Sequence, residues 1–200
     1  MSAYRIYGDS NSGNCCKVKW TADLLGVGYD WIETSVLKGE TRSPDFRALN
    51  PAGQVPVLVT DKGRALAQSN AIILYLAEKH GGDLIPDKAF ARAKVYEWLF
   101  WEQYSHEPYV AVRRFQKFYL GTPDDQLDPK LLERGLAALA LMDRQLNEER
   151  FIAGPEFTLA DIALLAYTRL APEGGFDLGA FPALRAWIAR AEKRLDIGAA

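Results

Sequence analysis

Gln68 and Ser69 lie where a predicted strand leads directly into a predicted helix. The first N–H groups of a helix have no partner within it, and the helix dipole places partial positive charge there. A carboxylate is therefore expected to bind well at Ser69, with Gln68 beside it. Ser69 could also cap the helix, which is a common use of serine. The two roles are compatible, because a capped helix end still has unpaired N–H groups.

A second group of polar side chains follows the first predicted strand. Residues 9–14 read DSNSGN, which is typical of a turn, and a helix is expected over residues 15–25. The Ser12 hydroxyl is too weakly acidic to act as a base, so we expect it to donate a hydrogen bond to a charged group. Asn14 could donate in the same way, or it could be the N-cap of the helix.

Cys15 and Cys16 are the two cysteines of the chain. Adjacent cysteines make a poor structural disulfide, and two thiols cannot build a zinc site. We therefore expect no metal and a reducing compartment, the cytoplasm. The position of both residues in the first turn of the predicted helix favours small buried side chains.

Pro56 lies inside a predicted strand, residues 55–60. Proline removes a donor from the hydrogen-bond ladder, so it is normally confined to sheet edges and bulges. Its presence indicates either an edge strand or a cis bond between Val55 and Pro56. A turn at residues 61–63 then leads to a second strand, residues 64–68, which completes a hairpin.

An aromatic segment, residues 95–109, lies in the second half of the chain. Its large side chains cannot all face one core, and Pro108 should kink or interrupt the helix. One interpretation is a pocket for an apolar molecule, with Tyr104, His106 and Arg113 at its wall. The other is helix packing and dimer contact, which is the more common role for each residue taken singly.

The order of elements predicts two domains of different class. Strands and helices alternate up to His80, and strand signals disappear after a Gly- and Pro-containing segment. We expect an α/β domain over residues 1–81, a linker over residues 82–88 and an all-helical domain over residues 89–200. The helices expected in the second domain cover residues 89–119, 129–147, 159–170 and 181–195.

Composition excludes several classes of protein. The chain has 200 residues, 48% of them apolar and 25% charged, with a net charge of -2. The sequence contains no Lys- or Arg-rich block of the kind that binds nucleic acid or an anionic membrane. The first ten residues do not resemble a secretory signal. The longest apolar stretch of the second half, residues 162–167, is too short to span a bilayer.

Three motifs carry a resemblance to a known family. They are SGNCCKV at residues 12–18, NPAGQVPVL at 50–58 followed by QSNAI at 68–72, and FTLAD at 157–161. Together with the order of elements, they resemble the cytosolic glutathione transferase superfamily, in particular its bacterial and theta-like serine branches. The resemblance extends over essentially the whole chain. It implies a thioredoxin-like N-terminal domain, an all-α helical-bundle C-terminal domain and a homodimer.

The resemblance also implies a site for glutathione as co-substrate. The γ-glutamyl carboxylate is expected at Ser69 with Gln68 assisting. The backbone of Val55, exposed by a cis Pro56, is expected to pair with the cysteinyl part of the tripeptide. The residues expected near the glycine carboxylate are Gln54, Thr41 and Lys38, of which the last two could equally be ordinary loop residues.

Ser12 is the residue that the resemblance implies for thiol activation, and Asn14 corresponds to an asparagine that contacts the thiol in one bacterial branch. A hydrogen bond to a charged sulfur contributes about 1.5 to 3 kcal/mol, or roughly 1 to 2 pKa units. Lower nucleophilicity offsets most of the gain in thiolate, which leaves a net benefit of roughly threefold. Further candidates are Ser10, Tyr7, and a mixed disulfide at Cys15 or Cys16.

The implied activity is addition of glutathione to hydrophobic electrophiles, in a role of detoxification, or reduction of peroxides or disulfides by glutathione. The alternative is a non-catalytic binding or regulatory protein with the same fold. A glutaredoxin-like oxidoreductase would need a cysteine ahead of the first helix, which this chain lacks. Thr158 and Asp161 have the spacing of a helix capping box and are expected to serve folding alone.

Overall fold

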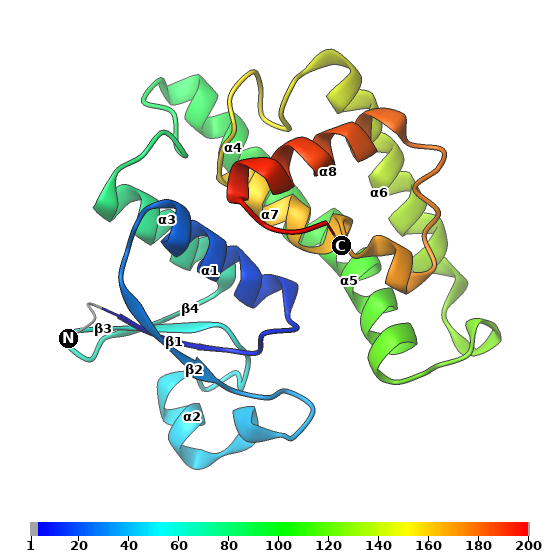
Figure 1. Cartoon of the computed structure of the whole chain (residues 1–200). Coiled ribbons are helices and arrows are strands. Elements are labelled where there is room, and N and C mark those ends of the chain that lie inside the picture. Colours follow the sequence, from blue (N-terminus) through cyan, green and yellow to red (C-terminus); the bar gives the residue numbers. More distant parts are fainter. Residues whose placement is uncertain (1–3, 200) are drawn as a thin grey trace. The chain divides into compact units, whose positions relative to one another are not determined.

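The computed structural model describes residues 4–199, which divide into two compact units between Gly82 and Asp83 (Figure 1). The N-terminal unit contains a mixed sheet of strand order β2-β1-β3-β4. β1 is parallel to β2 and antiparallel to β3. The elements of this unit are β1 (Tyr4–Gly8), α1 (Gly13–Leu24), β2 (Tyr29–Glu33), η1 (Glu40–Arg42), α2 (Pro44–Leu49), β3 (Val57–Thr60), β4 (Ala65–Ala67) and α3 (Ser69–His80).

Helices cover both faces of this sheet. Figure 1 shows α1 and α3 side by side on one face and α2 on the other. Side chains alternate between the two faces along each strand. On the α2 face, Val57 and Val59 pack with Phe46, and Tyr7 lies against the same cluster. The helices α1 and α3 therefore pack together on one face of the sheet. The β1–α1 connection leads into the first of them, and Ser69 begins the second.

The C-terminal unit is helical. Its helix α7 (Leu159–Thr168) is buried along its whole length, and its sequence is accordingly apolar on every side. Trp187 of the last helix is also fully buried. The elements are α4 (Ala89–Trp101), η2 (Glu102–His106), α5 (Glu107–Arg114), η3 (Phe115–Tyr119), η4 (Asp124–Gln126), α6 (Pro129–Glu148), α7 (Leu159–Thr168), η5 (Ala171–Gly174) and α8 (Pro182–Leu195).

The helix predicted over residues 89–119 is interrupted, as the position of Pro108 indicated. A π-helical turn, η2, separates α4 from α5, and Pro108 occupies the first turn of α5. Proline has no N–H to bond to the carbonyl four residues earlier, so a regular helix cannot continue through this point. A second π-helical turn, η3, ends the segment.

The predicted capping box at the start of α7 is confirmed, and Asp161 does more than cap. Its carboxylate accepts hydrogen bonds from the Thr158 amide at 2.8 Å, the Thr158 hydroxyl at 3.2 Å, the Ile152 amide at 2.9 Å and Trp187 Nε1 at 2.8 Å. Burial raises the pKa of Asp161 to about 6, although these donors lower it. The group is therefore still ionised at neutral pH, and it joins α7, α8 and the preceding loop.

The predicted fold class is confirmed, and the differences lie at element ends. β3 begins at Val57 rather than at residue 55, because residues 55 and 56 form a bend with a cis peptide bond. The predicted linker also contributes to the C-terminal unit, since Leu84 is buried and its carbonyl accepts a hydrogen bond from the Leu159 amide at 3.0 Å. Across residues 4–199, no helix has the length and apolar character needed to cross a membrane.

Replacement of Asp161 by Ala should destabilise the protein by about 3 to 5 kcal/mol, because it leaves buried donors without an acceptor. Urea unfolding followed by tryptophan fluorescence measures this loss. Asp125→Ala, at an exposed position, is the control and should change the free energy of unfolding by less than about 0.5 kcal/mol. A loss below about 1 kcal/mol in Asp161→Ala would contradict the role given to this carboxylate.

Candidate functional site

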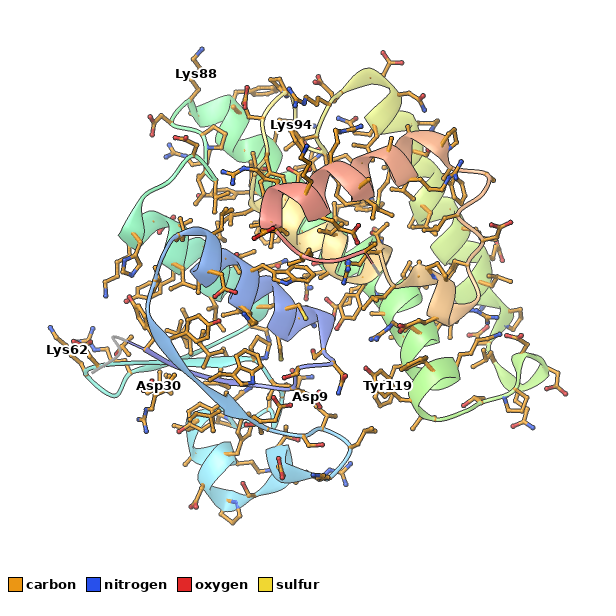
Figure 2. The ribbon with its side chains drawn as sticks, in the orientation of Figure 1. Asp9, Asp30, Lys62, Lys88, Lys94 and Tyr119 are labelled. Carbon is orange, nitrogen blue, oxygen red and sulfur yellow. The ribbon has the colours of Figure 1, made fainter. Side chains whose placement is uncertain are left out.

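The connection between β1 and α1 is braced by two carboxylates, and Figure 2 shows Asp9 at its start. Asp9 accepts hydrogen bonds from the amides of Asn11 and Val36, each at 3.0 Å. Glu33 accepts from the Ser10 amide at 3.0 Å, the Ser10 hydroxyl at 2.6 Å and Trp31 Nε1 at 2.7 Å. Hydrogen bonds from Ser10 and then Trp31 lower the pKa of Glu33. The hydroxyl of Ser10 is thus engaged by Glu33.

Ser12 occupies the N-cap position of α1, yet its side chain does not cap the helix. Its backbone carbonyl accepts hydrogen bonds from the amides of Cys15 and Cys16, at 3.0 and 2.9 Å. Ser43 behaves differently at the start of α2, where its hydroxyl accepts from the Phe46 amide at 3.3 Å. The hydroxyl of Ser12 is therefore not used to cap α1, and its neighbour within the chain is the Cys15 thiol.

The thiol of Cys15 is buried inside the N-terminal unit. Its exposed fraction is 0%, and its sulfur accepts a hydrogen bond from the Asp9 amide at 3.4 Å. Burial raises the pKa of this thiol to about 12, although the hydroxyl of Ser12 and the Asp9 amide lower it. Cys16 is half-buried, with its sulfur 3.8 Å from the Ser10 carbonyl. Cys15 is a small buried residue, as predicted, and is not a thiolate near neutral pH.

The start of α3 is joined to the first turn of α1 by a side-chain hydrogen bond. Ser69 is the first residue of α3, and its hydroxyl donates to Asn14 Oδ1 at 2.9 Å. Asn14 lies inside α1 rather than at its N-cap, so the interpretation of Asn14 as the cap is wrong. Simple capping by Ser69 is also wrong, because Gln68 holds the N-cap position of α3 and no side chain caps that helix.

Gln68 has an unusual backbone conformation, with φ 70° and ψ 111°. Residues with a Cβ rarely adopt positive φ values, and such strain is found preferentially at functional sites. Its side chain is exposed beside the uncapped start of α3. The sequence predicted Gln68 as a site residue but gave no sign of this conformation.

The backbone at Val55 is unpaired within the described chain. The bond between Val55 and Pro56 is cis. Within residues 4–199, neither the amide nor the carbonyl of Val55 takes part in a hydrogen bond. The preceding loop is held by Asn50, whose Nδ2 donates to the Gln54 carbonyl at 2.7 Å and whose Oδ1 accepts from the Ala52 amide at 3.1 Å. Asn50 supports the site although the sequence did not mark it as a candidate.

The remaining candidates of the N-terminal unit differ in exposure. The side chains of Gln54 and Lys38 are exposed, whereas Thr41 is buried. A side chain at Gly53, whose φ is 64°, would come within 3.2 Å of the Thr41 carbonyl, so the two segments pack closely. Tyr7 lies edge-on against Phe46, with ring centroids 6.3 Å apart, and serves the core of this unit.

The three residues predicted for an electrophile pocket do not share one surface. Tyr104 is 82% exposed, whereas His106 is fully buried and shares a hydrogen bond of 3.0 Å between its Nε2 and the Thr168 hydroxyl. Arg113 is also buried; its Nε donates to the Gly174 carbonyl at 2.8 Å and its guanidinium pairs with Asp124 at 2.7 Å. The structure thus places His106 and Arg113 in the framework of the helical unit, which corrects the prediction of a shared wall.

Arg113 lines a separate cavity of about 600 Å³ in the C-terminal unit. Lys117 pairs with Asp124 at 2.5 Å, so both cations at this cavity share one carboxylate. The apolar part of the lining consists of Leu127, Pro129, Leu132 and Leu136. The described residues contain no group of three or more His, Cys, Asp or Glu side chains arranged to hold a metal ion.

A small mixed sheet with an open Val-cis-Pro bend, followed by a helical unit, defines the two-domain glutathione transferase class of fold. Family models described as glutathione S-transferase, N-terminal domain, and glutathione S-transferase, C-terminal domain, match residues 11–79 and 96–194. Glutathione S-transferase 3 of Zea mays is 34% identical over 197 residues, covering 94% of this chain and 88% of the relative. The chain belongs to the glutathione S-transferase family, as its sequence predicted.

Solved structures agree with this assignment. A glutathione S-transferase from Pseudomonas fluorescens Pf-5 is 44% identical, with a TM-score of 0.91 and coverage of 96% of this chain and 95% of that chain. A theta class glutathione S-transferase from Xanthomonas axonopodis pv. citri, solved with glutathione bound, is 29% identical, with a TM-score of 0.87 and full coverage of both chains. The resemblance to glutathione transferases therefore extends to the three-dimensional fold.

The two cysteines should differ sharply in reactivity. Iodoacetamide reacts with thiolates, so at about pH 8 the thiol of Cys15, with its raised pKa, should remain unmodified while Cys16 is alkylated. Mass spectrometry of the peptide that contains both residues, with Cys16→Ser as control, measures this. Rapid alkylation of the folded Cys16→Ser variant would contradict the burial of Cys15.

Proposed function

We propose that this chain is a glutathione transferase that binds glutathione on its N-terminal unit and directs the thiolate to a hydrophobic electrophile. The observation that carries the proposal is the arrangement at the starts of α1 and α3. Ser12 keeps its hydroxyl free of capping, while the hydrogen bond from Ser69 to Asn14 holds the uncapped start of α3 at the same turn. The names of the relatives and the glutathione-bound theta class neighbour support it.

Each part of the tripeptide has a matching group in the proposed site. The uncapped start of α3, with Gln68 and Ser69, takes the γ-glutamyl carboxylate. The open amide and carbonyl of Val55 pair with the cysteinyl backbone as an added strand would. Gln54, whose side chain is exposed, is the candidate for the glycine carboxylate, with Lys38 as an exposed cation. Thr41 acts through the packing of its segment, since its side chain is buried.

Ser12 is the proposed donor to the glutathione sulfur, and Asn14 a second donor from the same turn. Neither group is a base, so the thiol proton leaves to solvent and the donors stabilise the thiolate that remains. Cys15 cannot compete as a nucleophile, because its thiol stays protonated. Since lower basicity reduces nucleophilicity, this activation is modest, and most of the rate enhancement must come from positioning the electrophile.

The electrophile is proposed to be apolar. Of the residues predicted to contact it, Tyr104 remains a candidate because its side chain is exposed. His106 and Arg113 are no longer proposed as contacts, since both are buried and hydrogen-bonded within the helical unit. Reduction of peroxides or of small disulfides by glutathione uses the same thiolate and belongs to the same proposal.

A homodimer in the cytoplasm, with a role in detoxification, completes the proposal. Two phenylalanine side chains of α4 are largely exposed, Phe90 at 80% and Phe100 at 76%. Ten residues along an α-helix correspond to about 2.8 turns, so the two positions lie about 80° apart around the axis of α4, within one broad stripe. Burial of exposed aromatic rings is a strong driving force for association. The partner proposed for this face is a second copy of the chain.

Replacement of Ser12 by Ala should raise the pKa of the bound glutathione thiol by about 1 to 2 units. With a chloronitrobenzene as electrophile, kcat/KM should fall about fivefold near pH 6.5, and the loss should disappear at about pH 9, where both thiols are ionised. Ser10→Ala is the matched control, because its hydroxyl belongs to the same turn but is engaged by Glu33. A larger loss of kcat/KM in Ser10→Ala than in Ser12→Ala would show that Ser12 is not the donor to the sulfur.

Replacement of Phe100 by Glu should convert a dimer into a monomer, because it buries a charge in the proposed interface. Sedimentation at micromolar concentration should give twice the chain mass of 22.3 kDa for the wild type and 22.3 kDa for the variant. Phe118→Glu, at an exposed phenylalanine of η3, is the control and should remain dimeric. A wild-type species of 22.3 kDa would refute the homodimer.

A further inference from the structure

The cavity of about 600 Å³ lies wholly within the C-terminal unit, and its lining residues all fall between positions 113 and 175. α5 and η3 contribute one side of it, and η4 and α6 contribute the other. α5 and α6 pack side by side, which holds the two sides together (Figure 1). Cavities of about 300 to 1,000 Å³ typically hold small organic molecules. None of the lining residues belongs to the proposed glutathione site.

The polar end of this cavity is cationic. The Arg113 side chain is only 6% exposed, and Lys117 lies one helical turn further on and is partly exposed. Both pair with Asp124, at 2.7 and 2.5 Å, and Arg113 Nε also donates to the Gly174 carbonyl at 2.8 Å. A guanidinium has five N–H donors and an ammonium has three. The donors of these two cations therefore outnumber the acceptors that the described residues supply to them.

Asp124 is a displaceable partner for the two cations. Its side chain is 59% exposed, and it lies on the short helix η4 in the connection between η3 and α6. The hydrogen bond from Lys117 is the main reason why the pKa of Asp124 is lowered. An ion pair with a largely exposed carboxylate contributes little free energy, so this carboxylate can turn to solvent at small cost. It occupies the position that the anionic group of a ligand would take.

The rest of the cavity suits an aliphatic chain. Leu127 is almost fully buried at its floor, and three residues of α6 at spacings of three and four form a stripe beside it: Pro129, Leu132 and Leu136. No aromatic ring is present among the described residues that line the cavity. Glu133 is exposed at the same cavity and disfavours a second negative charge on the ligand.

We propose that this cavity is a binding site for an amphipathic monoanion, an alkyl carboxylate, distinct from the sites for glutathione and the electrophile. The ligand carboxylate replaces Asp124 as the partner of Arg113 and Lys117. The alkyl chain lies on Leu127 and on the apolar stripe of α6. The inference does not depend on the binding of glutathione, because every residue that carries it belongs to the C-terminal unit.

The experiment titrates the ¹⁵N-labelled full chain with octanoate and follows backbone amides by heteronuclear NMR. Gly175 and Lys117 both line the cavity, so their amides report occupation of this site. Octan-1-ol has the same chain length without the charge and is the matched ligand. Octanoate should shift both amides in a saturable way, with a dissociation constant at least about tenfold lower than that of octan-1-ol.

Two substitutions test the two ends of the site. Lys117→Ala should weaken octanoate about tenfold and octan-1-ol less than about twofold, because only octanoate carries a charge. Lys130→Ala, which removes an exposed cation of α6 outside the cavity, is its control. Leu132→Ala should weaken both ligands about threefold through loss of apolar contact. Leu131→Ala is the control for that substitution, because Leu131 does not line the cavity.

Asp124→Asn is the most discriminating variant, because it removes the competing charge and keeps the size of the side chain. It should tighten octanoate about threefold or more and leave octan-1-ol unchanged. Asp125→Asn makes the same change of charge one position along η4 and should alter neither affinity by more than about twofold. If Asp124 served only to hold η4 in place, Asp124→Asn would weaken octanoate or leave it unchanged.

The inference is overturned if octanoate leaves the amides of Gly175 and Lys117 unshifted, if octan-1-ol binds as tightly as octanoate, or if Asp124→Asn fails to tighten octanoate. Should Lys117→Ala fail to fold, the comparison of Asp124→Asn with Asp125→Asn decides alone. Failure of the proposed function is seen separately, because wild-type protein would then not bind glutathione, whatever octanoate does.

Discussion

The hydrogen bond between Ser69 and Asn14 connects the two helix starts on which the proposed site depends. Glutathione is flexible and charged at both ends, so an anion site alone would not place its thiol. The packing of α1 on α3 fixes the distance between the anion-binding end of α3 and the turn that carries Ser12. That fixed distance converts binding of the γ-glutamyl group into placement of the sulfur, which is the contribution of proximity to catalysis.

The turn itself is kept in shape by groups that do not contact the tripeptide. Asp9 and Glu33 together accept hydrogen bonds from the turn, from β2 and from the segment that follows β2. These bonds provide acceptors for the amides of residues 10 and 11. Ser12 then begins α1, and its hydroxyl does not cap the helix. The site is thus a supported arrangement in which framework carboxylates hold the turn that presents the Ser12 hydroxyl.

Local signals in the sequence were sufficient where both partners lie within a few residues. Thr158 and Asp161 form the capping box that was expected. The cis bond before Pro56 was predicted from the motif that contains it, and it is present. These features depend on short-range geometry, which residue types and spacing record directly.

Features that depend on distant partners could not be predicted. Nothing in the sequence joins Asn14 to Ser69, or Ser10 to Glu33, because the partners meet only after the sheet and its helices have packed. The same reason explains the error at His106, whose partner Thr168 lies 62 residues away on α7. An aromatic segment with a histidine fits a ligand pocket and a helical core equally well, and tertiary packing decides between them.

The central claim is that the start of α3 and the open backbone of Val55 together place the glutathione sulfur beside Ser12. A crystal structure of this protein with glutathione bound measures the distance from that sulfur to Ser12 Oγ directly. The account predicts that the sulfur lies within hydrogen-bond distance of this oxygen, with the γ-glutamyl carboxylate at the first turn of α3. A tripeptide bound at α3 with its sulfur out of reach of both Ser12 and Asn14 would contradict it.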